Sequence, residues 1–263
     1  MPLSSTRVYE ATHGCTSWRG ERVDAGGGFD EFLAGPVAAR LDDAEGTGEL
    51  REHLRGLSLT GMGQQALEDV LSAEVPEERD WAAGEALAEA YLEEHHEVVL
   101  PWNTERDKRN PFGSLPGADI VGFQRDGDSH RLALGEVKCS SEDRSPPQVM
   151  TGRSGMAHQL DRLASDLGIV CQLLKWLLPR VRRTEHEPVF NTACARYFNS
   201  GNRALSLFGV LIRDKAPRES DLGNRGQALG NTLQAPTSCE LIGLYLPFAI
   251  SDLPAEIRKG GVA

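Results

Sequence analysis

Long hydrophobic runs are missing from this sequence of 263 residues. The first twenty residues are polar, and the most apolar later segment is interrupted by Lys175 and Pro179. A helix that spans a membrane needs about 20 consecutive, mostly apolar residues, and an export signal needs a shorter apolar stretch near the N-terminus. We therefore expect a soluble, cytoplasmic protein with no membrane partner.

Cysteine is scarce as well, with five residues and no Cys-x-x-Cys spacing. An odd and scattered set indicates neither a disulfide framework nor a zinc site, and it fits a reducing compartment. The sequence has no Walker A phosphate-binding loop, because the glycines at 26–28 lack its spacing. It also has no helix-turn-helix or zinc-finger pattern. Any ATP-driven step would therefore require a separate protein.

Positive charge is in short supply overall, since the formal net charge is −11. Residues 1–100 carry 7 Lys or Arg against 21 Asp or Glu, a balance of −14, which leaves +3 for the remainder. Residues 144–183 carry a balance of +5. Because Lys and Arg bind nucleic-acid phosphates, we expect Arg144, Arg153 and Arg162 to contact nucleic acid. The basic residues at 180–183 have a second explanation, because cations are favoured near a helix C-terminus.

The chain is long enough for one large core, and 40% of its residues are hydrophobic. We expect an acidic, mostly helical N-terminal subdomain at 1–78, with short helices at 36–44 and 62–74, and a core at 79–263. Apolar periodicity predicts a long helix at 156–178, and apolar runs predict two late buried strands at 205–212 and 240–249. The segment between these strands is expected to be a long loop. Together these elements predict an α/β fold with a mixed central sheet flanked by helices.

Two neighbouring segments place charged residues on apolar strands. Asp119 begins the run Asp-Ile-Val-Gly-Phe, and Glu136-Val137-Lys138 ends the run that starts at Leu132. The Asp-Gly at 126–127 is a strong hairpin signal, which would lay the two strands antiparallel. Side chains alternate along a strand, so Glu136 and Lys138 share a face. Asp119 and Glu136 are then close enough to share a cation.

Oxygen ligands of this kind suit Mg²⁺, or Mn²⁺ in its place. We expect the carboxylates of Asp119 and Glu136, with the Val137 carbonyl, to bind the ion, which would offset the cost of burying unpaired charge. Lys138 would orient or help deprotonate an attacking water, or balance charge in the transition state. The alternative is an edge hairpin whose acids and lysine are solvated and paired with one another.

Two helices offer further candidates. Residues 81–94 form a predicted helix on which Glu85 shares a face with apolar residues, so Glu85 is either a further metal ligand and catalytic residue or part of a solvated face. Glu89, Glu93 and Glu94 are predicted to form such a solvated acidic face. Gln159, near the start of the helix predicted at 156–178, either contacts the metal site or DNA, or caps the helix.

The order of Asp119, a hairpin and Glu136-Val137-Lys138 resembles the signature of the PD-(D/E)xK nuclease superfamily. That resemblance implies a restriction-endonuclease-like core in which the two acids bind metal and the lysine assists the nucleophilic water. It also implies a helical glutamate before the first core strand, for which Glu85 is the candidate. Several members carry a Gln where this chain has Gln159. RecB-like members follow it with Tyr, where this chain has Leu163.

The order of elements over about residues 80–250 is also similar to nuclease subunits of bacterial anti-phage defence systems, particularly the Hachiman type. This likeness implies a DNA nuclease that works with a helicase or ATPase partner, which the acidic N-terminal section would contact. A catalytically silent nucleic-acid-binding or scaffold subunit and an RNase are the alternatives. Formation of a homo-oligomer is left open.

Overall fold

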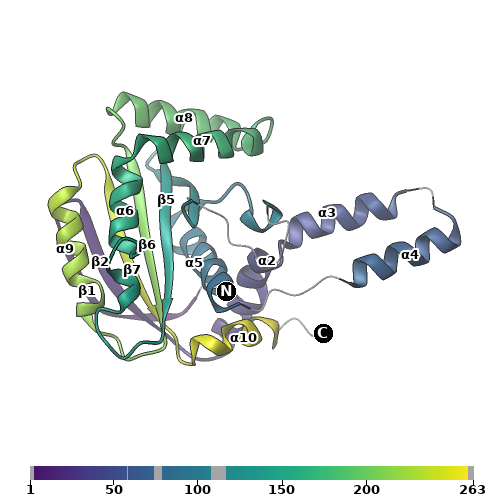
Figure 1. The fold of residues 1–263 in the computed structure, drawn as a ribbon, viewed down its shortest axis with the longest axis horizontal. Helices are drawn as coiled ribbons and strands as arrows, with labels where there is room; N and C mark the ends of the chain where they lie inside the picture. Colours follow the sequence, from purple (N-terminus) through teal and green to yellow (C-terminus); the bar gives the residue numbers. More distant parts are fainter. Residues whose placement is uncertain (1–2, 58, 74–78, 108–116, 260–263) are drawn as a thin grey trace.

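The computed structural model describes residues 3–57, 59–73, 79–107 and 117–259. Its centre is a seven-stranded sheet in the order β1-β2-β7-β6-β5-β4-β3 (Figure 1). The four central strands β2, β7, β6 and β5 run parallel, while β1, β4 and β3 join antiparallel at the two edges. The strand bounds are β1 Ser5–His13, β2 Thr16–Val23, β3 Val98–Val99, β4 Ile120–Asp126, β5 Ser129–Ser140, β6 Leu205–Arg213 and β7 Ser238–Tyr245.

Helices cover both faces of the sheet, and each face has its own apolar core. Helices α1, α2, α5 and α10 pack on one face, and α6, α7, α8 and α9 belong to the core on the other. The predicted α/β fold with a mixed, helix-flanked sheet is confirmed. No helix in the described ranges is long and apolar enough to cross a membrane. The helix bounds are α1 Gly27–Phe32, α2 Ala38–Leu41, α3 Ala44–Arg55, α4 Gly61–Ser72, α5 Asp80–His96, α6 Met156–Ser165, α7 Leu167–Val181, α8 Glu187–Asn199, α9 Gly223–Thr232 and α10 Leu253–Lys259.

The predicted hairpin and the predicted helix before it are confirmed. Strands β4 and β5 pair antiparallel from Ile120 opposite Gly135 to Asp126 opposite Ser129, which leaves a two-residue turn. The helix expected at 81–94 lies within α5. The two late strands are β6 and β7, both buried and paired in parallel in the centre of the sheet. These elements bring the charged strand ends into the middle of the fold.

The N-terminal section is not a separate helical subdomain, because its first two strands belong to the central sheet. Strand β2 pairs in parallel with β7, from Thr16 opposite Cys239 to Arg22 opposite Tyr245, and β1 forms the edge. The boundary expected between residues 78 and 79 would cut through this one continuous sheet, so it is not a boundary between two domains. The polar residues of β1 and β2 concealed these strands, since β1 is a mostly exposed edge and the buried positions of β2 include the polar Thr16 and Glu21.

The long helix expected at 156–178 is two helices. The chain leaves the helical conformation at Asp166, and the Asp166 carboxylate accepts hydrogen bonds from the N–H groups of Gly168 and Ile169 at the start of α7. This is an N-cap, which favours a new helix start over continuation. Pro179 lies inside the last turn of α7, and the helix ends two residues later. The three- and four-residue spacing of apolar residues continues through Asp166, so the sequence pattern did not reveal the break.

A helix also occupies the middle of the loop expected between the late strands. Helix α9 has five polar and three glycine residues among its ten, a composition of low helix propensity. Close packing explains the glycines, because a Cβ atom on Gly226 would lie 2.3 Å from the Trp18 ring. Tertiary contact with β1 and β2 therefore stabilises a helix that the local sequence does not favour.

Candidate metal-dependent active site

Asp119 and Glu136 meet where β4 begins beside β5. The Asp119 N–H donates to the Gly135 carbonyl at 3.0 Å, and the Asp119 Oδ2 accepts a hydrogen bond from the Val137 N–H at 2.8 Å. The Asp119 carboxylate thus replaces a backbone carbonyl as the hydrogen-bond acceptor at the end of the β4–β5 pairing. The Asp119 and Glu136 carboxyl groups are close enough to influence each other's pKa. The two acids that the sequence singled out therefore lie side by side.

Lys138 completes this group from the same strand. Its Nζ lies 3.1 Å from Oε2 of Glu136. Glu136 and Lys138 both project from the face of β5 that α6 covers, as strand alternation requires. Glu136 is only 3% exposed and Lys138 is partly exposed. Glu136 is therefore not solvated, whereas the pairing of Lys138 with Glu136 agrees with the alternative of an edge hairpin whose charged groups pair with one another.

Burial and proximity raise the pKa of both carboxyl groups. The pKa of Glu136 rises to about 8, first because of burial and then because of Asp119, while Lys138 opposes the shift. Burial also raises the pKa of Asp119, against the opposing hydrogen bond from Val137. Two neighbouring carboxyl groups with little access to solvent resist ionising together. A divalent cation would remove that penalty and hold both groups ionised.

Helix α6 crosses the strand bearing these groups and brings Gln159 to the same side of the sheet. A Cβ on Gly209, the register partner of Glu136, would clash with Met156 and Leu160 of α6. Within the described residues, Oε1 of Gln159 is buried without a hydrogen-bond partner. Carboxylate and amide oxygens suit a hard cation such as Mg²⁺, and Gln159 stays a predicted contact of the metal site or of DNA. The Val137 carbonyl stays a predicted ligand.

Glu85 lies on the other side of β5, on helix α5. A Cβ on Gly84 would lie 2.3 Å from Sγ of Cys139, so the helix backbone rests directly on the strand. Burial raises the pKa of Cys139 to about 12, and Glu85 adds to that shift. In the described part of the chain, however, no three His, Cys, Asp or Glu side chains lie close enough to hold a metal ion. Glu85 therefore does not form a three-carboxylate group with Asp119 and Glu136, and its role stays a prediction.

Glu89, one turn beyond Glu85, is a candidate that the sequence reasoning missed. It was assigned to a solvated face, but the structure buries it almost completely. Burial raises its pKa to about 7, and Asp119 is among the charges that add to the shift, whereas Arg40 opposes it. The signal in the sequence was weak, because Glu85 and Glu93, four residues away, share the face of Glu89 although alanines adjoin it in the chain. Its burial depends on α2, which brings Arg40 to within 3.9 Å of the Glu89 carboxylate.

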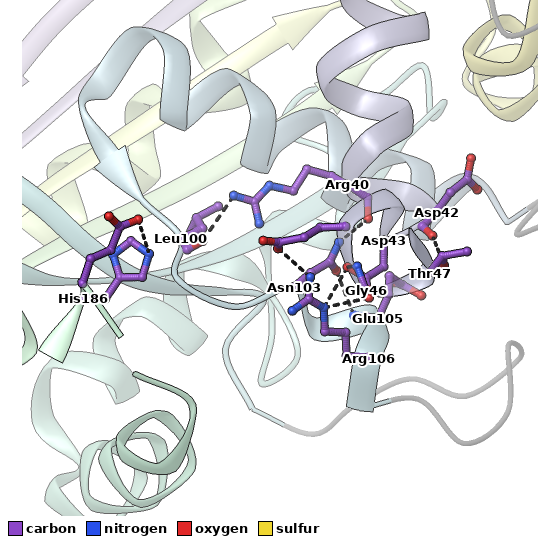
Figure 2. A network of polar contacts seen from close by, with 12 residues as sticks. Arg40, Asp42, Asp43, Gly46, Thr47, Leu100, Asn103, Glu105, Arg106 and His186 are labelled. Atoms are coloured by element: carbon purple, nitrogen blue, oxygen red, sulfur yellow. Dashed lines mark hydrogen bonds and ion pairs between the residues drawn. The ribbon is translucent and has the colours of Figure 1, made fainter. Parts of the chain in front are cut away.

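A polar network ties the N-terminal helices to the segment that leads into the site (Figure 2). Arg40 pairs with Glu93 and donates to the Leu100 carbonyl at 3.3 Å, and its own carbonyl accepts from Asn103 at 2.7 Å. Arg106 pairs with Asp43 at 2.8 Å. Residues 100–107 are thereby fixed against α2 and the start of α3.

The arginines expected to contact nucleic acid are all exposed. Arg144 follows β5, Arg153 precedes α6, and Arg162 lies on α6, where it pairs with Asp166 at 3.6 Å. Arg213 holds the loop after β5 in place. This arginine is buried and paired with Asp221 at 3.1 Å. Arg213 also donates to backbone carbonyls of this loop, including that of Arg144. The structure thus positions Arg144 beyond the strand end that carries Lys138.

Comparison of the chain with known proteins gives no family. No protein-family model matches it, and no curated protein matches it significantly. The arrangement of Asp119, Glu136 and Lys138 is therefore the feature that indicates a function.

Proposed function

We propose that the chain is a metal-dependent nuclease that hydrolyses DNA phosphodiester bonds. One observation carries the proposal: the half-buried Asp119 and the buried Glu136 lie side by side where β4 begins beside β5, and the Lys138 ammonium lies 3.1 Å from the Glu136 carboxylate. A purely structural role does not call for two neighbouring acids, because the raised pKa of Glu136 shows that this group ionises only with difficulty beside Asp119. A site built to receive a divalent cation accounts for the second acid.

The residues have separate tasks in this proposal. Asp119 and Glu136 would hold Mg²⁺ or Mn²⁺, with the Val137 carbonyl and Gln159 as further candidate oxygen donors. The ion supplies charge stabilisation at the scissile phosphate and acidifies a bound water. Lys138 orients the attacking water and balances negative charge as it develops in the transition state.

DNA is the proposed substrate because the exposed arginines lie on segments that border the site. Arg144 and Arg153 belong to the connection between β5 and α6, and Arg162 lies on α6 itself. Basic side chains placed in this way follow a phosphate backbone without reading base sequence. We further propose, from the resemblance to defence nucleases, that a helicase or ATPase partner delivers the DNA in an anti-phage system.

The test is cleavage by the purified chain, with Mg²⁺ and with EDTA. Supercoiled plasmid, linear duplex, single-stranded DNA and RNA of matched sequence are the substrates, each tested alone and with the products of neighbouring genes. We expect DNA cleavage that needs Mg²⁺ and is lost in Asp119→Asn and Lys138→Ala. Lys259→Ala, which removes an exposed lysine from α10, is the matched control and should cleave normally. Cleavage of RNA alone, or equal cleavage by Lys138→Ala and wild type, would contradict the proposal.

A further inference from the structure

Exposed large hydrophobic side chains are concentrated on two surfaces of the described chain. Eight such residues are exposed, and only Val8 lies elsewhere. Four lie in residues 44–72 and three border α7 and α8. Single exposed apolar residues are ordinary on a protein surface, whereas a cluster marks an interaction site. The two groups are Leu50, Leu57, Met62 and Val70, and Leu167, Leu178 and Phe198.

The first surface is an arm formed by α3 and α4, residues 44–72, which projects away from the sheet (Figure 1). Neither helix has a buried residue. Along α4, Met62, Ala66 and Val70 recur every four residues and so share one face. Met62 is 85% exposed and Val70 is 69% exposed. The arm therefore presents an apolar stripe that the described part of the chain leaves exposed.

The second surface is a groove between α7 and α8. It has a volume of about 440 Å³ and is lined almost entirely by apolar side chains, among them Leu167, Leu174, Leu178 and Phe198. Lys175 is the one charged residue in its lining among the residues described. Helix-in-groove recognition uses this combination of an apolar helix face and an apolar groove.

Charge makes the two surfaces complementary. The arm carries five Asp or Glu and two Arg, a balance of −3. Residues 167–199, which contain α7 and α8, carry five Lys or Arg and two Glu, a balance of +3. Glu68 and Asp69 adjoin Val70 on the arm, while Lys175 lies in the groove. Opposite charges beside matching apolar patches steer association and fix its register.

We infer that the chain forms a homodimer in which the α4 stripe of each copy occupies the α7–α8 groove of the other. Both complementary surfaces belong to one sequence, and the arm extends away from its own body. Two copies related by a twofold axis would use both surfaces of each chain and leave none exposed. Closed twofold dimers are the commonest oligomers of soluble proteins. The inference does not depend on the proposed nuclease activity.

The first test is the mass of the full chain in solution over about 1–50 µM, a range that detects micromolar dissociation constants. Sedimentation velocity or light scattering should give twice the chain mass of 28.6 kDa. The double variants Met62→Glu with Val70→Glu, and Leu178→Glu with Phe198→Glu, should each be monomeric. Val8→Glu is the matched control, because it charges the remaining exposed hydrophobic residue, and it should stay dimeric.

Mixing the two monomeric variants distinguishes this reciprocal arm-in-groove dimer from dimers built in other ways. The arm variant keeps an intact groove, and the groove variant keeps an intact arm, so together they restore one of the two contacts. A heterodimer should therefore appear in the mixture, although neither variant dimerises alone. An arm-to-arm or groove-to-groove dimer would not be rescued, which would overturn the proposal.

Cross-linking tests the contact without disturbing it. Cys171 lines the groove and is the one exposed cysteine of the five. With Met62→Cys or Val70→Cys, a short bismaleimide should link two copies, and Cys171→Ser should abolish the link. A wild-type protein that is monomeric throughout the concentration range overturns the inference, even if the arm then binds a different protein.

Discussion

Replacing Glu136 by glutamine should stabilise the metal-free protein. Burial and Asp119 raise the pKa of Glu136 from the ordinary 4.5 to about 8. The folded state therefore binds a proton that the unfolded state has released, between pH 4.5 and 8. The contribution of this group to stability is fully present below pH 4.5 and is lost as the pH rises. Glutamine is neutral in both states and is free of this loss.

The raised pKa of Glu136 sets the size of this stabilisation. At pH 7 the gap between the pH and the ordinary pKa of Glu136 corresponds to about 3 kcal/mol in the free energy of unfolding, at 1.36 kcal/mol per pH unit. For a chain of this size that is a rise of roughly 6–12 °C in Tm. At pH 4 the variant and the wild type should be almost equally stable.

Urea unfolding of metal-free protein at pH 4, 5.5, 7 and 8 measures this difference directly. Glu52→Gln, which neutralises an exposed acid on α3, is the control and should follow the wild type at every pH. Adding Mg²⁺ at pH 7 should stabilise the wild type and not Glu136→Gln, since only the wild type retains both carboxylates. Parallel stability profiles for Glu136→Gln and wild type would refute the buried-pair reasoning.

Three further outcomes are expected. Lys138→Ala should lower the cleavage rate on the order of 10²–10³-fold with an unchanged circular dichroism spectrum, because it removes a charge that acts on the transition state; a normal rate contradicts this. Arg213→Met should cost about 3–5 kcal/mol in urea unfolding, because it leaves the Asp221 carboxylate buried and unpaired, and a loss below 1 kcal/mol would show that the pair is not needed. Gly84→Ala should lower the free energy of unfolding by about 1–3 kcal/mol, because the added methyl group overpacks against Cys139. Cys139→Ala should recover part of that loss in a double-mutant cycle, and additive effects would show that the two residues are not in contact.

The parts of the fold set by local sequence could be predicted. An Asp-Gly turn between alternating strands defines a hairpin within about twenty residues, so it fixed Asp119 opposite Glu136 before any tertiary contact was known. The apolar content of residues 80–96 similarly defined α5. The chemistry of the candidate site was predictable for the same reason, since Asp119, Glu136 and Lys138 lie on one hairpin.

The parts set by distant contacts could not be predicted. Strand β2 pairs with β7 across more than two hundred residues of sequence, and its polar residues carry no clear strand signal. Helix α9 forms because Gly226 admits the Trp18 ring, which is invisible in a local window. Burial of Glu89 depends on α2 supplying Arg40 from another part of the chain. Tertiary packing overrode local propensity in each case.

Binding of Mn²⁺ to the metal-free protein, followed by calorimetry in buffers of different ionisation enthalpy, tests the central claim most directly. The raised pKa of Glu136 means that the ion must displace a proton at pH 7. We predict saturable binding with a heat that varies between buffers, and loss of that binding in both Asp119→Asn and Glu136→Gln. Absence of binding to the wild type, or binding by both variants equal to that of the wild type, would contradict a metal centre at these carboxylates.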